Sequence, residues 1–200
     1  NFYGANTDWP WHNWNAARRR MPGAGFHFFS WDAEWTFGIG NDVNTDRTGE
    51  TAGSPGTLYT RLRQHPEFRV QFGDHAQKHL FNGGALTPAV TDARWMKRAT
   101  EIDRAIVPES ARWGGGNTRQ TWLAAQSAVR SWFPVRTAIL LNQLRNAGLY
   151  PQLNAPGFSP FGGLVAPGHP LAFTNGNASG SIYFTLDGSD PRLWGGGLSA

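Results

Sequence analysis

The sequence has no cysteine, and only Lys78 and Lys97 among its 18 basic residues are lysines. The absence of cysteine excludes both a disulfide framework and a thiolate metal site. Because no apolar run approaches the length of a membrane-spanning helix, we expect no membrane span in this piece. The basic excess is only +4 at pH 7, and the chain has no known reader motif, so we expect no nucleic-acid partner.

The other basic residues are arginines, and Arg18 to Arg20 are consecutive. A planar guanidinium group matches phosphate and carboxylate groups well, so this cluster has one interpretation as a contact for phosphate or an acidic substrate. The second interpretation is an exposed strand edge whose charges prevent aggregation. From the sequence we favour the second.

Tryptophan is abundant, with 10 residues, and half of them lie within the first 35 positions. They surround the polar residues Asp8, Asn13, Asp32 and Glu34. Asp8 and Asn13 are five positions apart, which is the spacing between the catalytic aspartate and the metal-binding asparagine of protein kinases.

A β-hairpin is predicted between these polar groups. Residues 14–20 can form a strand, residues 21–25 have the composition of a turn, and residues 26–31 can form the returning strand. An antiparallel hairpin brings its open ends together, so Asn13 and Asp32 should meet and form a site for Mg²⁺. Asp8 would face the substrate hydroxyl as a base. The alternative is that these acids are turn or capping residues.

Two segments carry a family resemblance. D-W-P-x-x-N-W from Asp8 and F-x-F-F-S-W-D-x-E-W-T-F-G from Phe26 resemble the spore-coat protein H (CotH) kinase family. Further similarity to this family lies downstream, in residues 58–62, 65–69, Ile106, Glu109, Arg112 and Trp113. The resemblance covers roughly residues 1–148 and is most specific up to Gly38.

The resemblance implies a secreted or cell-surface atypical protein kinase that transfers phosphate from ATP and Mg²⁺ to protein hydroxyls. It implies a distantly kinase-like fold in which Asp8 matches the catalytic-loop aspartate. Asn13 and Asp32 match residues that bind the metal and, through it, the nucleotide. Glu34 stands where members commonly have aspartate, and it would be an auxiliary metal ligand.

The C-terminal part has a second resemblance. Residues 155–159, 162–163 and 181–192, which include the run T-L-D-G-S-D-P-R, are similar to the chitobiase/β-hexosaminidase C-terminal module. Apolar and polar side chains alternate along 182–186, as a half-buried strand requires, and residues 187–191 supply a tight turn. The resemblance implies an immunoglobulin- or fibronectin-like β-sandwich. Its expected role is that of a spacer or accessory piece rather than a sugar-binding one.

A mainly helical region is predicted between the two ends. Helices are expected over 55–64, from Pro66, from Pro88 after a Thr87 cap, after Thr118, and from Pro134 to Gly148. The proline- and glycine-rich stretch 149–170 marks the boundary between a kinase-like part, residues 1–150, and a sandwich part, residues 151–200.

The expected fold class is therefore α+β, with a hairpin and helical lobe followed by a partial β-sandwich. A kinase-like nucleotide-binding lobe does not fit before Asp8, and the sandwich does not fit after residue 181, so we expect a piece of a longer polypeptide. Its partners would be a protein substrate, the rest of the same polypeptide and a surface polysaccharide. The alternatives are a non-catalytic surface protein with a degenerate kinase-like lobe and a carbohydrate-binding module that uses exposed tryptophans.

Overall fold

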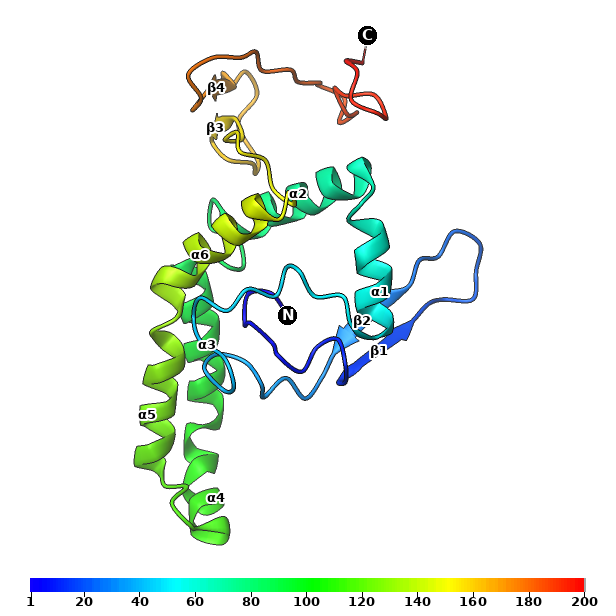
Figure 1. Ribbon diagram of the computed structural model, residues 1–200. Coiled ribbons are helices and arrows are strands. Elements are labelled where there is room, and N and C mark those ends of the chain that lie inside the picture. The colour runs from blue at the N-terminus through cyan, green and yellow to red at the C-terminus, as the bar shows by residue number, and fades with distance from the viewer. Residues whose placement is uncertain (200) are drawn as a thin grey trace.

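The chain combines helices with small antiparallel sheets, as Figure 1 shows. The computed structural model describes residues 1–199. The helices are α1 Gly53–Leu62, α2 Pro66–Leu80, α3 Pro88–Ile102, α4 Ile106–Trp113, α5 Arg119–Arg130 and α6 Phe133–Asn146, with a 3-10 turn at Asp103–Ala105. The strands are β1 Trp14–Ala17, β2 His27–Ser30, β3 Gly157–Ser159 and β4 Ala172–Thr174. The general α+β class is therefore confirmed.

The predicted hairpin is present, but its ladder is shorter than expected. β1 pairs with β2 from Trp14 opposite Ser30 to Ala17 opposite His27, so the expected strands 14–20 and 26–31 were too long. Pro22 has no N–H to donate and Gly23 has a φ of +75°, which favours an open loop over residues 18–26. The hairpin therefore ends in a broad, unpaired tip.

Most predicted helix starts are confirmed. Pro66 and Pro88 occupy the first turns of α2 and α3. The N–H groups of a first turn have no hydrogen-bond partner within the helix, so the missing proline N–H costs nothing there. Thr118 caps α5 in a reciprocal pair with Thr121. α1 begins at Gly53, slightly before the predicted start at residue 55. Thr87 stands at the N-cap position of α3, but its hydroxyl donates to the Gly84 carbonyl and does not cap the helix, and α4 was not predicted.

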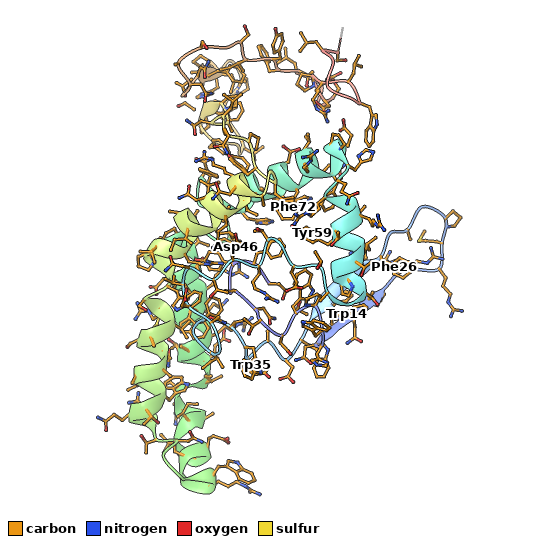
Figure 2. All side chains as sticks on the ribbon, viewed as in Figure 1. Trp14, Phe26, Trp35, Asp46, Tyr59 and Phe72 are labelled. Carbon is orange, nitrogen blue, oxygen red and sulfur yellow. The ribbon has the colours of Figure 1, made fainter. Side chains whose placement is uncertain are left out.

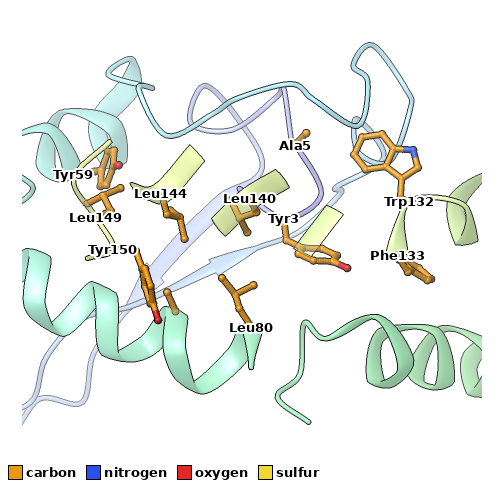
Figure 3. Packing of buried hydrophobic residues seen from close by; sticks show 11 residues of the cluster. Tyr3, Ala5, Tyr59, Leu80, Trp132, Phe133, Leu140, Leu144, Leu149 and Tyr150 are labelled. Carbon is orange, nitrogen blue, oxygen red and sulfur yellow. The ribbon is translucent and has the colours of Figure 1, made fainter. Parts of the chain in front are cut away.

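The core lies where α2 and α6 meet the N-terminal segment and the residues that follow α6 (Figure 3). Its buried side chains are Tyr3, Ala5, Tyr59, Ala76, Leu80, Trp132, Phe133, Leu140, Leu144, Leu149 and Tyr150. Figure 1 shows the N-terminal segment and the loop before α1 running between α1, α2, α3 and α6. The helices thus form a frame, and the loops that hold the polar motif fill it.

Arg136 of α6 is fully buried and ties two of these loops together. Its guanidinium donates to the backbone carbonyls of Phe2 at 2.5 Å and Tyr3 at 2.8 Å. It also donates to those of Val43 at 2.6 Å and Thr45 at 3.2 Å. Burial lowers the pKa of Arg136, although nearby Asp46 acts in the opposite direction. One side chain thereby sets the spacing between the N-terminal segment and the loop before α1.

The predicted strand at 182–186 is absent from the described structure. Residues 181–185 are irregular, and Leu186 is 89% exposed rather than half-buried. Phe184 packs on Phe173 of β4 with ring centres 4.8 Å apart. The Thr185 hydroxyl donates instead to the Ser189 carbonyl. Such local hydrogen bonds compete with the hydrogen bonds between paired strands, so this segment ends in a turn and forms no strand. The β-sandwich stays a prediction.

The C-terminal part docks onto the start of α2 through Glu67. The buried Glu67 carboxylate accepts two bonds from Arg192, at 2.9 and 2.6 Å, and one from the Gly195 N–H at 2.8 Å. Nearby, the rings of His65 and Trp194 lie 6.0 Å apart. Arg192 belongs to the run T-L-D-G-S-D-P-R, so that run contacts the helical part as well as forming its own turn.

This contact predicts an acid-sensitive stability. The hydrogen bonds from Arg192 and then from Gly195 lower the pKa of Glu67 from 4.5 to about 2. Because the pKa of Glu67 is lower in the folded state, its ionised carboxylate stabilises the folded state at pH values above 4.5, the unfolded pKa. This contribution is lost as the pH falls towards about 2. We expect Glu67→Gln to lower the unfolding temperature at pH 6, measured by circular dichroism.

The difference between the wild type and Glu67→Gln should shrink steadily between pH 4.5 and pH 2, because the wild-type carboxylate is then protonated. Glu101→Gln on the exposed face of α3 is the matched control, since it removes a surface carboxylate with the same amide. A Glu67→Gln difference that stays constant across this range would contradict the docking role.

No helix in the described part of the chain is both long and apolar enough to cross a membrane.

Candidate functional site

A tight turn fixes the position of Asp8. The Asn6 side-chain oxygen accepts from the N–H groups of Asp8 at 2.9 Å and Trp9 at 3.1 Å. The Asp8 carbonyl then accepts from the N–H groups of Trp11 at 3.0 Å and His12 at 3.3 Å. An asparagine that binds the backbone two residues ahead is a common way to begin a turn. The chain therefore reverses after Asp8 and returns towards the hairpin.

Asn13 joins Asp8 to Asp32. Its side-chain nitrogen donates to the Asp8 carboxylate and, at 3.1 Å, to the backbone carbonyl of Asp32. The Trp31 N–H donates to the Asn13 carbonyl at 3.0 Å, which extends the hairpin pairing by one step. The expectation that Asn13 and Asp32 meet at the open end of the hairpin is therefore confirmed, and Asp8 adjoins them.

Asn13 and Asp32 share an unusual backbone conformation. Their φ angles are +59° and +46°, in the left-handed region that most L-residues avoid. Asparagine and aspartate tolerate this region best, and residues held there are concentrated at functional sites. Both residues leave the strand geometry at the same end of the hairpin. Neither Asp32 carboxylate oxygen accepts a hydrogen bond from residues 1–199, so the group is available to a ligand.

Glu34 is not brought into this cluster. It is exposed and makes no hydrogen bond to Asp8, Asn13 or Asp32. Within the described residues, no three His, Cys, Asp or Glu side chains converge in a way that would hold a metal ion. The structure thus joins the Asp8 carboxylate, the Asn13 amide and the Asp32 main-chain carbonyl at the hairpin end, and the Asp32 carboxylate belongs to the same turn. A magnesium ion that keeps several waters or phosphate oxygens needs no more than that from the protein.

The tryptophans near the site do not enclose it. They surround its residues in the sequence, but Trp11 is 62% exposed and Trp31 is 55% exposed. Trp35, labelled in Figure 2, is 45% exposed. Trp9 and Trp14 are half-buried and line a cleft of about 240 Å³ between the hairpin and α1, together with Phe28, Phe29 and Leu58. The site is therefore open, with an apolar cleft on the neighbouring hairpin face.

Arg47 supports the Asp8 turn and was missed by sequence reasoning. Its guanidinium donates to the carbonyls of Asn6 at 3.0 Å and Trp9 at 2.7 Å, and it pairs with Glu50 at 2.8 Å. The only sequence signal was the three-residue spacing of Arg47 and Glu50, which predicts a local ion pair and nothing about residue 6 or 9. The polar loop of residues 38–53 therefore has a positioning role.

α1 holds the same loop from the other side. The Tyr59 hydroxyl and the Arg63 guanidinium both donate to the Thr48 carbonyl, at 2.7 and 2.8 Å. Burial raises the pKa of Tyr59, while the nearby positive charge of Arg63 acts in the opposite direction. Arg47 is thus presented to the Asp8 turn by a loop that α1 and α6 both anchor.

Comparisons with known proteins found no relative. No family model, no curated protein and no solved structure matches the chain. The resemblance to CotH kinases and to the chitobiase C-terminal module stays a prediction. The case for a function therefore depends on the arrangement of Asp8, Asn13 and Asp32.

Proposed function

We propose that this chain is part of an atypical, CotH-like protein kinase that transfers phosphate from Mg²⁺-bound ATP to protein hydroxyls. The observation that carries the proposal is the Asn13 amide, which joins the Asp8 carboxylate to the main-chain carbonyl of Asp32. These residues have the order and the residue types of a kinase catalytic aspartate and its metal ligands. Sequence spacing alone did not require the three to touch.

Asp8 is the general base, which takes the proton from the hydroxyl group of the protein substrate. One of its carboxylate oxygens is bonded to the Asn13 amide, which fixes the orientation of the carboxylate. The other oxygen accepts no hydrogen bond from the described residues, so it can receive a proton from an approaching hydroxyl. Asn6 and Arg47 hold the backbone on both sides of Asp8. Such fixed positioning is the main contribution of the protein in phosphoryl transfer.

Asn13 and Asp32 would hold the metal. The Asn13 nitrogen is used by Asp8 and Asp32, which leaves its side-chain oxygen as the ligand atom. The Asp32 carboxylate adds the negative charge that Mg²⁺ requires. Bound Mg²⁺–ATP supplies the phosphoryl group and neutralises charge on its oxygens. Glu34 is exposed and apart from this cluster, so any metal role for it is auxiliary.

The proposal extends to the organisation of the whole chain. Residues 1–150 would be the C-terminal portion of the kinase domain, and residues 151–200 would belong to a chitobiase-like sandwich. The Glu67–Arg192 contact supports a module held at a defined position, as expected for a spacer. A secreted or cell-surface location follows from both resemblances and is part of the proposal.

Replacing Asp8 by asparagine separates its role from that of the metal ligands. In the full-length protein we expect Asp8→Asn to keep Mg²⁺-dependent ATP binding in calorimetry. Phosphate transfer to a protein acceptor should fall by about 10²–10⁴, because a general base contributes this factor. The asparagine oxygen can still accept from Asn13, so the turn should persist.

The matched variant is Asn13→Ala, which removes a metal ligand and is expected to weaken Mg²⁺-dependent ATP binding as well as transfer. Unaltered transfer by Asp8→Asn would contradict the base assignment. Absence of ATP binding in a well-folded wild-type protein would favour a non-catalytic surface protein whose kinase-like site is degenerate.

A second candidate function is carbohydrate binding. The observation in its favour is the exposure of Trp11, Trp31 and Trp35 around the open end of the hairpin. Exposed aromatic rings offer stacking faces for apolar ligand surfaces, including the faces of sugar rings. Quenching of tryptophan fluorescence by oligosaccharides without a Mg²⁺ requirement, and its loss in Trp31→Ala, would support this function over phosphoryl transfer.

A further inference from the structure

The hairpin tip extends away from the rest of the molecule. Figure 1 shows β1 and β2 leading outward beside α1, and Figure 2 places Trp14 at the base and Phe26 farther out. The ladder ends at Ala17 opposite His27, so the tip comprises residues 18–26. It includes Arg18, Arg19 and Arg20, all of which are exposed. The hairpin therefore has the proposed site at one end and a basic cluster at the other.

The position of the arginines argues against a role in protecting a strand edge. Charges that block edge-to-edge pairing must lie on residues whose N–H and C=O groups could pair with another strand. The paired residues of β1 are Trp14–Ala17 and those of β2 are His27–Ser30, and none of them is Arg, Lys, Asp or Glu. The arginines begin only where the ladder ends. The structure thus favours the other interpretation, in which the arginines contact phosphate or an acidic substrate.

The tip combines positive charge with apolar surface. The Arg18 guanidinium lies 5.2 Å from the ring centre of Phe26, which is itself 61% exposed. Met21, which belongs to the same tip, is 57% exposed. In the described part of the chain, no carboxylate forms an ion pair with Arg18, Arg19 or Arg20. Three guanidinium groups on one short loop are therefore open to an external anion.

We propose that this tip binds an acidic segment of the protein acceptor. The proposal rests on the proposed function and specifies its substrate class. Arginine binds carboxylates through two parallel hydrogen bonds, and a nearby aromatic side chain keeps the guanidinium plane oriented. Peptides of glutamate and aspartate with an occasional apolar residue match the charge and the exposed Phe26 and Met21 of the tip.

The hairpin also sets the distance between the acidic segment and the acceptor hydroxyl. Arg19 follows Asn13 by six positions, and a strand rises about 3.3 Å per residue, so the tip lies roughly 20 Å from the site. An extended peptide covers this span in about six residues. The acidic residues of the acceptor should accordingly lie about six positions from its phosphorylated serine or threonine.

The test uses a fluorescein-labelled peptide with a serine and three glutamates about six positions away. Its binding to the full-length protein is measured by fluorescence anisotropy, and its phosphorylation is measured separately. The triple variant Arg18→Ala/Arg19→Ala/Arg20→Ala should bind the peptide at least about tenfold more weakly. Its KM for the peptide should rise by a similar factor, with kcat and ATP binding unchanged. Added salt should weaken wild-type binding but affect the triple variant little.

The matched control is Arg94→Ala/Arg104→Ala/Arg112→Ala, which removes the same charge from exposed positions on or beside α3 and α4. It should bind the acidic peptide like the wild type. A peptide with lysine in place of glutamate should bind neither the wild type nor this control variant. Equal affinity of the wild type and the tip variant for the acidic peptide would overturn the proposal.

Two further outcomes separate the possible failures. Heparin or a single-stranded polynucleotide that displaces the peptide, and binds the tip far more tightly, would overturn the proposal in favour of a general polyanion surface. Peptide binding that requires the tip, in a protein that transfers no phosphate, supports the docking role and refutes only the proposed kinase activity. Asp32→Asn should retain peptide binding, because the tip is remote from the metal ligands.

Discussion

Replacing Asp32 by asparagine is expected to lower phosphate transfer by about 10³-fold or more, because on the proposed function it removes the negative charge that would hold the metal. The fold should be retained. Asparagine tolerates the left-handed conformation of residue 32, and the Asp32 carboxylate accepts no hydrogen bond from residues 1–199 that the amide would lose. The measurements are transfer of labelled phosphate from ATP and the unfolding temperature.

Two controls define the specificity of this effect. Glu101→Gln removes an exposed carboxylate on α3 whose one ion-pair partner within residues 1–199 is Arg98, and it should leave the rate within about twofold. Glu34→Gln should have a much smaller effect than Asp32→Asn, because Glu34 is outside the cluster. Normal turnover by a folded Asp32→Asn protein would refute the metal assignment.

Replacing Arg136 by methionine is expected to destabilise the protein by about 3–5 kcal/mol. The change leaves the carbonyls of Phe2, Tyr3, Val43 and Thr45 without their donor, and unpaired polar groups in a protein interior cost free energy. Methionine nearly fills the same space, so the loss reports the hydrogen bonds rather than a cavity. Guanidinium chloride denaturation measures the free energy of unfolding.

Arg136→Lys should recover little of this loss, since an ammonium group has three donors at one point and cannot reach four separate carbonyls. Arg94→Met, at an exposed position of α3, should change stability by less than about 0.5 kcal/mol. A similarly small change for Arg136→Met would show that water replaces the guanidinium, and that the loops do not depend on it.

Sequence patterns predicted the parts of the fold that neighbouring residues determine. Pro66, Pro88 and Thr118 marked helix starts because proline and capping residues act within a single turn. The hairpin followed from a turn between two potential strands, and it was enough to bring Asn13 to the main chain of Asp32. The antiparallel pairing itself converts two distant polar residues into neighbours.

The contacts that anchor the site could not be predicted in this way. Arg47 reaches Asn6, Arg136 reaches Tyr3, and Arg192 reaches Glu67, and each of these pairs is far apart in sequence. Nothing in the local pattern distinguishes an arginine that binds buried carbonyls from one in solvent. The alternation at 182–186 failed for a related reason, because a strand also requires a hydrogen-bonding partner that its own residues do not specify.

The guanidinium groups of Arg47 and Arg136 recognise main-chain oxygen atoms of the loops they hold. Every amino acid provides such an oxygen, whatever its side chain. In the loop of residues 42–46 this applies to Asn44, which is exposed and whose carbonyl accepts from Gln143 at 2.7 Å. Its side chain can change while the path of the loop stays the same, whereas the side chains of Asp42, Thr45 and Asp46 accept N–H groups of the loop itself. A protein engineer can therefore vary residue 44 without rebuilding the support of the proposed site.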